Sequence, residues 1–256
     1  VLVWWAGQDD VVEQFAKGED VYSVFASKVY ERPISKKDPI ERFVGKTCVL
    51  GLGYGTGWEK LQHTLKTQPP GAVLSDLECK NLVSFYRNVN DKVIELWREC
   101  EDALKDLAQW PLTPNDTPKP NYYLGKNKCV LVTPRGIKLP NGLYITYPEL
   151  IWDTSEAKSK YTYKSRKGKV SIWGGSVVEN VVQALARIIV GEQMLEISQM
   201  YPVVLTVHDA AVVIAKESEV EETLKYVTNI MSQPPSWGKQ LPIACEAGYG
   251  VSYGEC

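Results

Sequence analysis

Apolar residues recur every three or four positions through most of the first 109 residues, and this spacing predicts a mainly helical N-terminal part. The longest periodic run, residues 77–109, predicts one or two helices, and shorter runs predict helices over residues 9–15, 19–30 and 58–65. Four prolines then fall within residues 111–120, where they exclude a regular helix and predict a surface connection.

Short β-branched and apolar runs replace the helical spacing later in the chain. Residues 129–133, 137–139 and 143–147 are expected to form strands, the last two joined by a turn at residues 140–142. Two apolar runs around residues 203–215 flank the pair His208 and Asp209, which predicts a buried hairpin with a carboxylate at its tip. Residues 241–245 are expected to lead into a last strand near residues 248–250, so the fold class is α+β.

One predicted helix carries charged side chains in a regular stripe. Asp38 is a good N-cap, with Pro39 at the first helical position and Glu41 placed to reach back to the cap. Four side chains then follow at steps of four and share one side of the helix: Arg42, Lys46, Leu50 and Tyr54. The stripe presents two cations, an aliphatic side chain and an aromatic ring.

Three glycines within the same run need an explanation, since each costs about 1 kcal/mol against alanine in a helix interior. We expect a ligand or a strand to approach the backbone at Gly45, Gly51 and Gly53. A P-loop fits poorly, because Ile40 stands where the first glycine of that motif belongs, and a dinucleotide loop lacks its last glycine. An ordinary amphipathic helix with solvated cations stays open as an alternative.

Two more capped helices and one basic segment complete the pattern. Residues 176–179 and 218–221 read as capping boxes, and Asn180 and Gln183 lie near the start of the first of these helices. Residues 158–169 alternate basic and aromatic side chains, which suits contact with a phosphate backbone. The basic members are Lys158, Lys160, Lys164, Arg166, Lys167 and Lys169. A solvated hairpin is the alternative for this segment.

The amino-acid composition excludes only a few classes of protein. The 256 residues are 44% hydrophobic, enough to bury the core of one large or two small domains. No stretch is apolar enough to cross a membrane, no secretory signal opens the chain, and the start without Met suggests a fragment. Six cysteines without a CxxC pair, with only two histidines, argue against structural zinc and for free thiols in a reducing cytoplasm. The net charge of −2 does not identify a partner.

The charged stripe resembles a motif of a known family. Arg-x3-Lys-x7-Tyr-Gly on a helix resembles the fingers helix of DNA polymerase I-like (family A) polymerases, in which the cations hold the incoming triphosphate. Arg42, Lys46, Tyr54 and Gly55 match this pattern, and Tyr54 would lie by the templating base. Leu50 departs from the usual aromatic and resembles some bacteriophage members.

Further segments resemble the same family, in the same order along the chain. Residues 1–8 resemble the segment that follows the first catalytic carboxylate motif, and Tyr22 stands where members often carry a phosphate-contacting histidine. The run ENVVQA at residues 179–184 resembles the palm helix of phage-type members, whose glutamine, here Gln183, reaches the minor groove. Val-His-Asp at residues 207–209 resembles the motif of the second catalytic carboxylate, although Ala210 replaces the usual glutamate.

The resemblance implies a right-hand polymerase that lacks its N-terminal part: a palm remnant at residues 1–8, helical fingers at 9–150, and an antiparallel-sheet palm at 151–256. It implies template-directed DNA synthesis on primer-template DNA with deoxynucleoside triphosphates, in the cytoplasm of a bacterial host. Two Mg²⁺ ions would be held by Asp209 and by a second carboxylate outside this chain, so the isolated chain is expected to be inactive. A non-catalytic nucleic-acid-binding remnant is the alternative.

The resemblance assigns these roles to the site residues. The catalytic residues would be Asp209, His208, Lys46 and Arg42; the nucleotide-binding residues Arg42, Lys46, Leu50, Tyr54 and Tyr22; and the DNA-binding residues Gln183, Asn180, Lys164, Arg166, Lys167 and Gly55.

Overall fold

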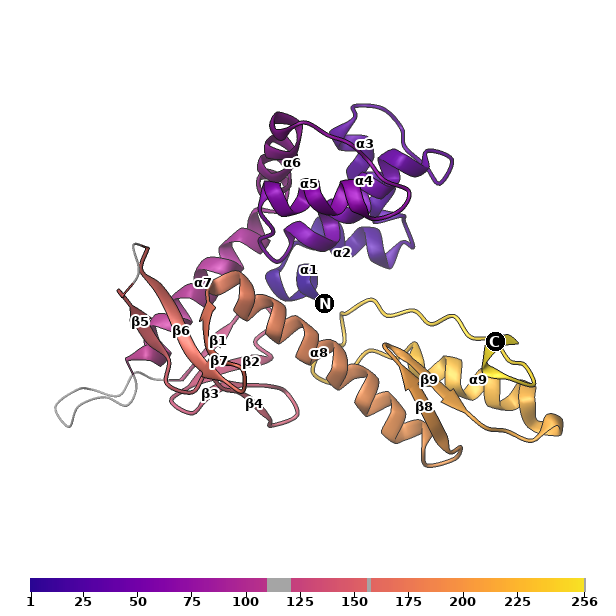
Figure 1. The fold of residues 1–256 in the computed structure, drawn as a ribbon. Coiled ribbons are helices and arrows are strands. Elements are labelled where there is room, and N and C mark those ends of the chain that lie inside the picture. The colour runs from indigo at the N-terminus through magenta and orange to yellow at the C-terminus, as the bar shows by residue number, and fades with distance from the viewer. Residues whose placement is uncertain (110–120, 156–157, 256) are drawn as a thin grey trace. The chain divides into compact units, whose positions relative to one another are not determined.

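The computed structural model describes residues 1–109, 121–155 and 158–255 (Figure 1). The chain divides into two compact units, Val1–Val182 and Gln183–Cys256, and the boundary falls inside a long helix. The surface connection predicted for residues 111–120 lies outside the described residues. We describe each unit by itself.

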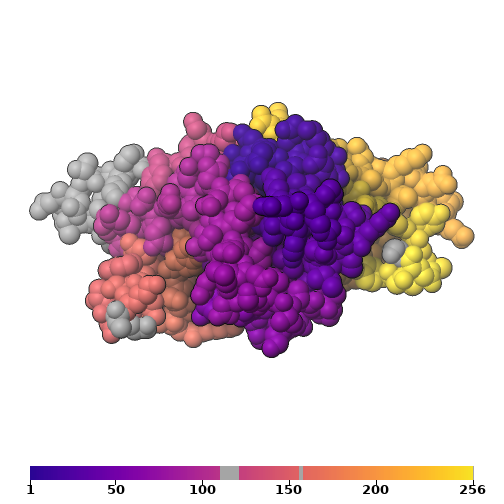
Figure 2. Space-filling view, turned by 90° about the horizontal axis from the view of Figure 1, so that it is seen from above, coloured from indigo at the N-terminus to yellow at the C-terminus, as the bar shows by residue number. Residues whose placement is uncertain are grey.

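Helices make up the first part of unit 1, as the spacing of apolar residues predicts. They are α1 (Leu2–Ala6), α2 (Asp9–Ala16), α3 (Val21–Val29), α4 (Pro39–Leu52), α5 (Trp58–Thr67), α6 (Asp76–Val89) and α7 (Asp91–Ala108). Asn90 divides the longest periodic run into α6 and α7, and its side-chain amide donates to the carbonyl of Tyr86 at 3.0 Å. In the space-filling view the atoms of these helices, indigo to purple, form one continuous surface (Figure 2).

The core of this helical part lies between α3, α4, α5 and α6. Its buried members include Phe25, Val44, Leu52, Leu61 and Tyr86. Burying a side chain of this size contributes about 1.5–3 kcal/mol, so the core fixes α4 firmly among its neighbours.

The glycines of α4 allow close helix packing at one point. A Cβ on residue 45 would overlap the carbonyl oxygen of Tyr22 and contact Ala26, both on α3. The expected close approach at Gly45 is therefore real, but a helix makes it, where a ligand or strand was expected. At Gly51 an added Cβ would make only ordinary contacts, with Thr56.

Two antiparallel sheets follow in unit 1. The first, in the order β1-β2-β3-β4, comprises β1 (Tyr122–Leu124), β2 (Val130–Thr133), β3 (Gly136–Lys138) and β4 (Tyr144–Ile145). The second, in the order β5-β6-β7, comprises β5 (Ile151–Asp153), β6 (Lys160–Ser165) and β7 (Gly168–Ile172). The strands predicted at residues 129–147 are confirmed, and the basic segment forms the β6–β7 hairpin. β1 and β5 are too short to show a pattern in the sequence.

Helix α8 (Gly174–Ile197) begins two residues before the predicted cap at Ser176, so the predicted capping box is wrong. The amides of Ser176 and Val177 donate to the carbonyl of Trp173, and the amide of Gly174 donates to Glu101 on α7 at 2.5 Å. A carboxylate from α7, distant in the sequence, therefore accepts the hydrogen bond of the first backbone amide of α8.

Unit 2 contains the rest of α8, a hairpin of β8 (Val203–Val207) and β9 (Ala210–Val213), the short 3₁₀ helix η1 (Glu217–Glu219) and α9 (Val220–Met231). Ile197, Val227 and Ile230 form its buried core, against which Val203 and Val213 pack. The helix predicted after residue 218 is confirmed, but its predicted cap is wrong: η1 takes up Ser218, and no side chain caps α9.

Two further predictions for unit 2 are wrong. The β8–β9 hairpin forms as predicted, yet it is not buried: Val204 and Leu205 are 51% and 46% exposed, because the core of α8 and α9 reaches only one end of this two-stranded sheet. Residues 241–250, all of them described, form no strand, and the last regular element is the 3₁₀ turn η2 (Tyr253–Glu255). Among the described helices, none has the length and apolar character needed to span a bilayer.

Candidate functional site

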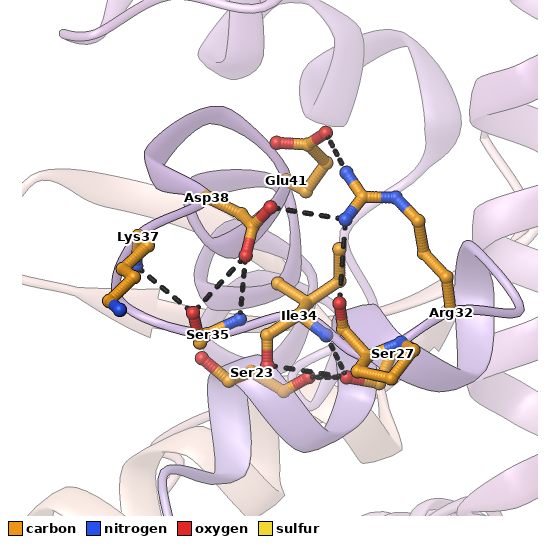
Figure 3. A network of polar contacts seen from close by, with 9 residues as sticks. Ser23, Ser27, Arg32, Ile34, Ser35, Lys37, Asp38 and Glu41 are labelled. Atoms are coloured by element: carbon orange, nitrogen blue, oxygen red, sulfur yellow. Dashed lines mark hydrogen bonds and ion pairs between the residues drawn. The ribbon is translucent and has the colours of Figure 1, made fainter.

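The first turn of α4 is fixed by an arginine from the preceding loop (Figure 3). Asp38 occupies the N-cap position and Pro39 the first helical position, as predicted, but the Asp38 side chain caps no helical amide. It accepts from the amide of Ser35 at 3.0 Å and from Arg32 Nη1 at 3.1 Å. Arg32 Nη2 also donates to Glu41 at 2.5 Å, so the predicted capping box is wrong because Arg32 occupies both carboxylates.

Arg42 lies one turn further along and is held by Asp20, the N-cap residue of α3. Its Nε and Nη2 donate to the two carboxylate oxygens of Asp20 at 2.6 and 3.2 Å. Its guanidinium carbon lies 5.5 Å from the centroid of the Tyr22 ring, so the structure brings these two predicted site residues together. The sequence analysis did not select Asp20. Its position two residues before Tyr22 is the sequence feature that could have identified Asp20 as a site residue.

Lys46 and Leu50 continue the stripe along α4. Both side chains are exposed, Leu50 by 51%, and Lys46 makes no hydrogen bond or ion pair with any residue that the structure describes. A cation that is fixed by an acid is thus followed, one turn on, by a cation open to solvent. The helix ends at Leu52, so Tyr54 lies in the following turn and does not extend the helical stripe as expected.

The turn after α4 is anchored by two tryptophans. Trp97 Nε1 donates to the carbonyl of Gly53 at 3.0 Å, and the edge of the Trp173 ring covers the backbone of Gly55 so closely that a Cβ there would overlap it. Gly55 has φ of +80°, which a side chain would also strain. Burial raises the pKa of Tyr54, and the negative charge of Glu179 raises it further. The two tryptophans are residues that the sequence analysis missed.

The predicted DNA-contacting side chains are exposed. Asn180 on α8 donates to the hydroxyl of Tyr147 at 3.2 Å, and Gln183 is exposed on the same helix. Lys164 pairs with Glu149 at 2.9 Å, whereas Arg166 and Lys167 occupy the tip of the β6–β7 hairpin.

His208 and Asp209 form the two-residue turn between β8 and β9 in unit 2, as predicted. His208 has φ of +55°, in the left-handed region that few residues other than glycine adopt. The Asp209 side chain is exposed and makes no hydrogen bond or ion pair within the described part of the chain, so both its oxygens are accessible. No cluster of three or more potential metal ligands occurs among the described residues.

Helices that carry a cationic stripe, antiparallel strands and an exposed hairpin that bears Asp209 follow one another along the chain, and this fold is similar to part of a solved polymerase domain. A solved structure of the POL domain of Pol1 from M. smegmatis, in complex with DNA primer-template and dNTP, superposes with a TM-score of 0.63 at 17% identity, over 99% of this chain and 38% of that one.

The sequence is similar to the DNA polymerase of Bacillus phage SP02, with 29% identity over 268 aligned residues that cover 99% of this chain. No model of a protein family matches. The chain spans 39% of the length of the phage polymerase. The resemblance to bacteriophage DNA polymerases and the α+β fold class are confirmed.

Proposed function

We propose that this chain is the fingers and palm portion of a DNA polymerase that adds deoxynucleotides to a primer 3′ end under the direction of a template. The observation that carries the proposal is the pair of cations on one side of α4, Arg42 half-buried and Lys46 exposed, in a chain whose fold is similar to a polymerase domain solved with primer-template and dNTP. The similarity to a phage DNA polymerase over 99% of the chain supports it.

In this proposal, the side chains along α4 and the turn after it contact different parts of the nucleotide. Arg42 and Lys46 stand one helical turn apart, so both can contact one triphosphate and neutralise its charge. Leu50 and Tyr54 would lie beside the base and sugar, and Tyr22 would stand behind Arg42. These contacts hold the reacting phosphate in place, which is the main contribution of a protein to phosphoryl transfer.

Asp209 suits a magnesium site, because its exposed carboxylate offers the oxygen ligands that Mg²⁺ prefers. His208 would shape the turn that presents this carboxylate. When bound, the magnesium ions would activate the 3′ hydroxyl and stabilise the departing pyrophosphate.

DNA would be held by other elements. In this proposal residues 9–150 are fingers and residues 151–256 palm; Asn180, Gln183 and Gly55 face the nascent base pairs, and Lys164, Arg166 and Lys167 contact duplex phosphates. The cellular setting we propose is the cytoplasm of a bacterial host.

Templated nucleotide binding tests the function without requiring turnover. A labelled primer-template with a dideoxy 3′ end is titrated with the chain in Mg²⁺, and the dissociation constant is measured by anisotropy with each of the four dNTPs. The nucleotide complementary to the template should tighten DNA binding by about tenfold, and the other three should not, because only the matched pair completes the contacts to α4. Asp209→Asn should remove the effect, and Glu217→Gln, an exposed acid of the same unit, should keep it.

The outcome separates the two functional classes. DNA binding that ignores the identity of the dNTP would identify a non-catalytic nucleic-acid-binding protein and overturn the proposal.

A further inference from the structure

We propose that Asp20 is a positioning residue for nucleotide binding: its carboxylate fixes the guanidinium of Arg42 so that the remaining N–H groups meet the triphosphate. The inference rests on the proposed function and deepens it, because it assigns a role to Asp20, the N-cap residue of α3, which would act through Arg42.

The contact between the two side chains defines an orientation. Arg42 donates through Nε and Nη2 to the two oxygens of Asp20, at 2.6 and 3.2 Å. Two parallel hydrogen bonds fix both the position and the plane of a guanidinium, whereas a single contact leaves it free to rotate. Nη1 makes no hydrogen bond with the residues that the structure describes, so its N–H groups remain available to an anion.

The carboxylate is itself held in place. The hydroxyl of Ser23 donates to Asp20 Oδ2 at 2.7 Å, and the Asp20 carbonyl accepts from the amide of Val24 in the first turn of α3. Partial burial alone would raise the pKa of Asp20, but the hydrogen bonds from Arg42 and Ser23 outweigh it and hold that pKa below its usual range. Asp20 is therefore charged at neutral pH.

α3 and α4 lie in close contact beside the Asp20–Arg42 pair. α3 packs on the backbone of α4 at Gly45, where even a methyl group would overlap the Tyr22 carbonyl. The first turn of α4 is also tied by Arg32 through Asp38 and Glu41 (Figure 3). A fixed carboxylate on a fixed helix makes Arg42 rigid before any nucleotide arrives.

Rigid placement reduces the cost of binding. An exposed arginine loses side-chain entropy when it is immobilised on a ligand, and a residue that is already ordered avoids most of this loss. Lys46, exposed and without such a partner, supplies a mobile point charge beside it. Removing Asp20 adds net positive charge to the site, so simple electrostatics predicts tighter anion binding, whereas positioning predicts weaker binding.

These opposite predicted changes in anion affinity make the proposal testable. Binding of inorganic triphosphate to the 256-residue chain is measured by calorimetry at low salt without metal, for the unchanged protein and for Asp20→Ala, Asp20→Asn, Arg42→Ala, Lys46→Ala and the double variant of residues 20 and 42. Asp20→Ala should weaken binding by about tenfold, and Asp20→Asn, which keeps one acceptor, by less. In the Arg42→Ala background, Asp20→Ala should have no further effect.

A matched control removes another acid. Glu13→Ala breaks the exposed Lys17–Glu13 pair of α2 and should leave triphosphate binding unchanged. Thermal unfolding is followed for every variant. If Asp20→Ala does not fold, Asp20→Asn carries the comparison.

Two failures can be told apart. If Lys46→Ala and Arg42→Ala weaken binding but the Asp20 variants bind as tightly as the unchanged chain, or more tightly, the positioning role is overturned and the nucleotide site stands. If none of the variants changes binding, the nucleotide site on α4 is wrong, and the role of Asp20 falls with it.

Discussion

Leu50 lies on the last full turn of α4, where its side chain is 51% exposed, so a larger residue fits without displacing a packed neighbour. We predict that Leu50→Tyr favours nucleotides that lack the 3′ hydroxyl over the matched dNTP, because the larger side chain and its hydroxyl can fill the space that the missing 3′ hydroxyl leaves. The measurement is the ratio of the dissociation constants of a matched dNTP and its dideoxy analogue in the complex with primer-template.

The control for this ratio is Ile40→Tyr, an exposed position in the first turn of the same helix, which should leave it unchanged. A ratio that is the same in Leu50→Tyr and the unchanged protein would contradict the role given to Leu50.

At the scale of the element, the β6–β7 hairpin carries two adjacent basic residues at its tip. Arg166 and Lys167 are exposed in the turn, while Lys164 is paired with Glu149. We predict that Arg166→Ala with Lys167→Ala lowers the slope of log K against log salt for DNA binding by about two, one unit for each lost phosphate contact. Affinity is measured by anisotropy between about 50 and 200 mM salt, the range over which such contacts weaken most visibly.

Lys216→Ala with Lys225→Ala, which removes two cations of unit 2, serves as the matched control and should keep the slope. An unchanged slope in the hairpin variant would show that the hairpin is only solvated.

One carboxylate links the two outer strands of the sheet β5-β6-β7. Asp153 on β5 accepts from the amide and hydroxyl of Ser155 and pairs with Lys169 on β7 at 2.5 Å, with only 8% of its side chain exposed. The hydrogen bond from Lys169, followed by those from Ser155, holds the pKa of Asp153 well below its usual range. The carboxylate therefore stabilises the folded state above about pH 4, the unfolded value, and this stabilisation is lost as pH falls through the folded-state pKa.

We predict that Asp153→Asn lowers the melting temperature near neutral pH and that the difference from the unchanged protein closes in acid. Melting is followed from pH 7 to pH 2. Glu149→Gln, whose partner Lys164 is exposed on the same sheet, should have little effect at any pH. A difference for Asp153→Asn that stays constant with pH would refute the role of the charge.

At the scale of the whole molecule, the burial of the cysteine side chains shows which parts of the chain exclude solvent. Among the cysteines that the structure describes, Cys48, Cys79 and Cys100 are buried and Cys129 and Cys245 are partly buried, all of them as free thiols. Burial raises the pKa of Cys48 to about 12 and that of Cys129 to about 11. Reaction with alkylating agents needs the thiolate, so both should be unreactive at pH 8 in the native state.

We predict that, among the five cysteines that the structure describes, iodoacetamide at pH 8 modifies Cys245 first and reaches Cys48, Cys79 and Cys100 only when denaturant unfolds unit 1. Peptide-resolved mass spectrometry follows each site, and the fully denatured chain gives the reference in which all react. Native-state labelling of Cys48 at the rate of Cys245 would contradict the packing of α4.

The sequence by itself determined the features that depend on near neighbours. Periodic apolar positions located α2 to α9, alternation and turn residues located β2 to β4 and the β8–β9 hairpin, and the order of the motifs indicated the resemblance to a polymerase. These features follow from the spacing of side chains on a helix or strand, which is a local property.

Only the tertiary structure decided which partners the charged and polar groups take. Asp38 and Glu41 accept hydrogen bonds from Arg32 and not from helical amides. Glu101 accepts from the first amide of α8, 73 residues later in the chain, and Asp20 accepts from Arg42, 22 residues later. The exposure of the β8–β9 hairpin and the absence of a strand in residues 241–250 were likewise invisible in the local pattern. A carboxylate takes whichever donors the packing of distant elements brings within about 3 Å, and no local periodicity encodes that choice.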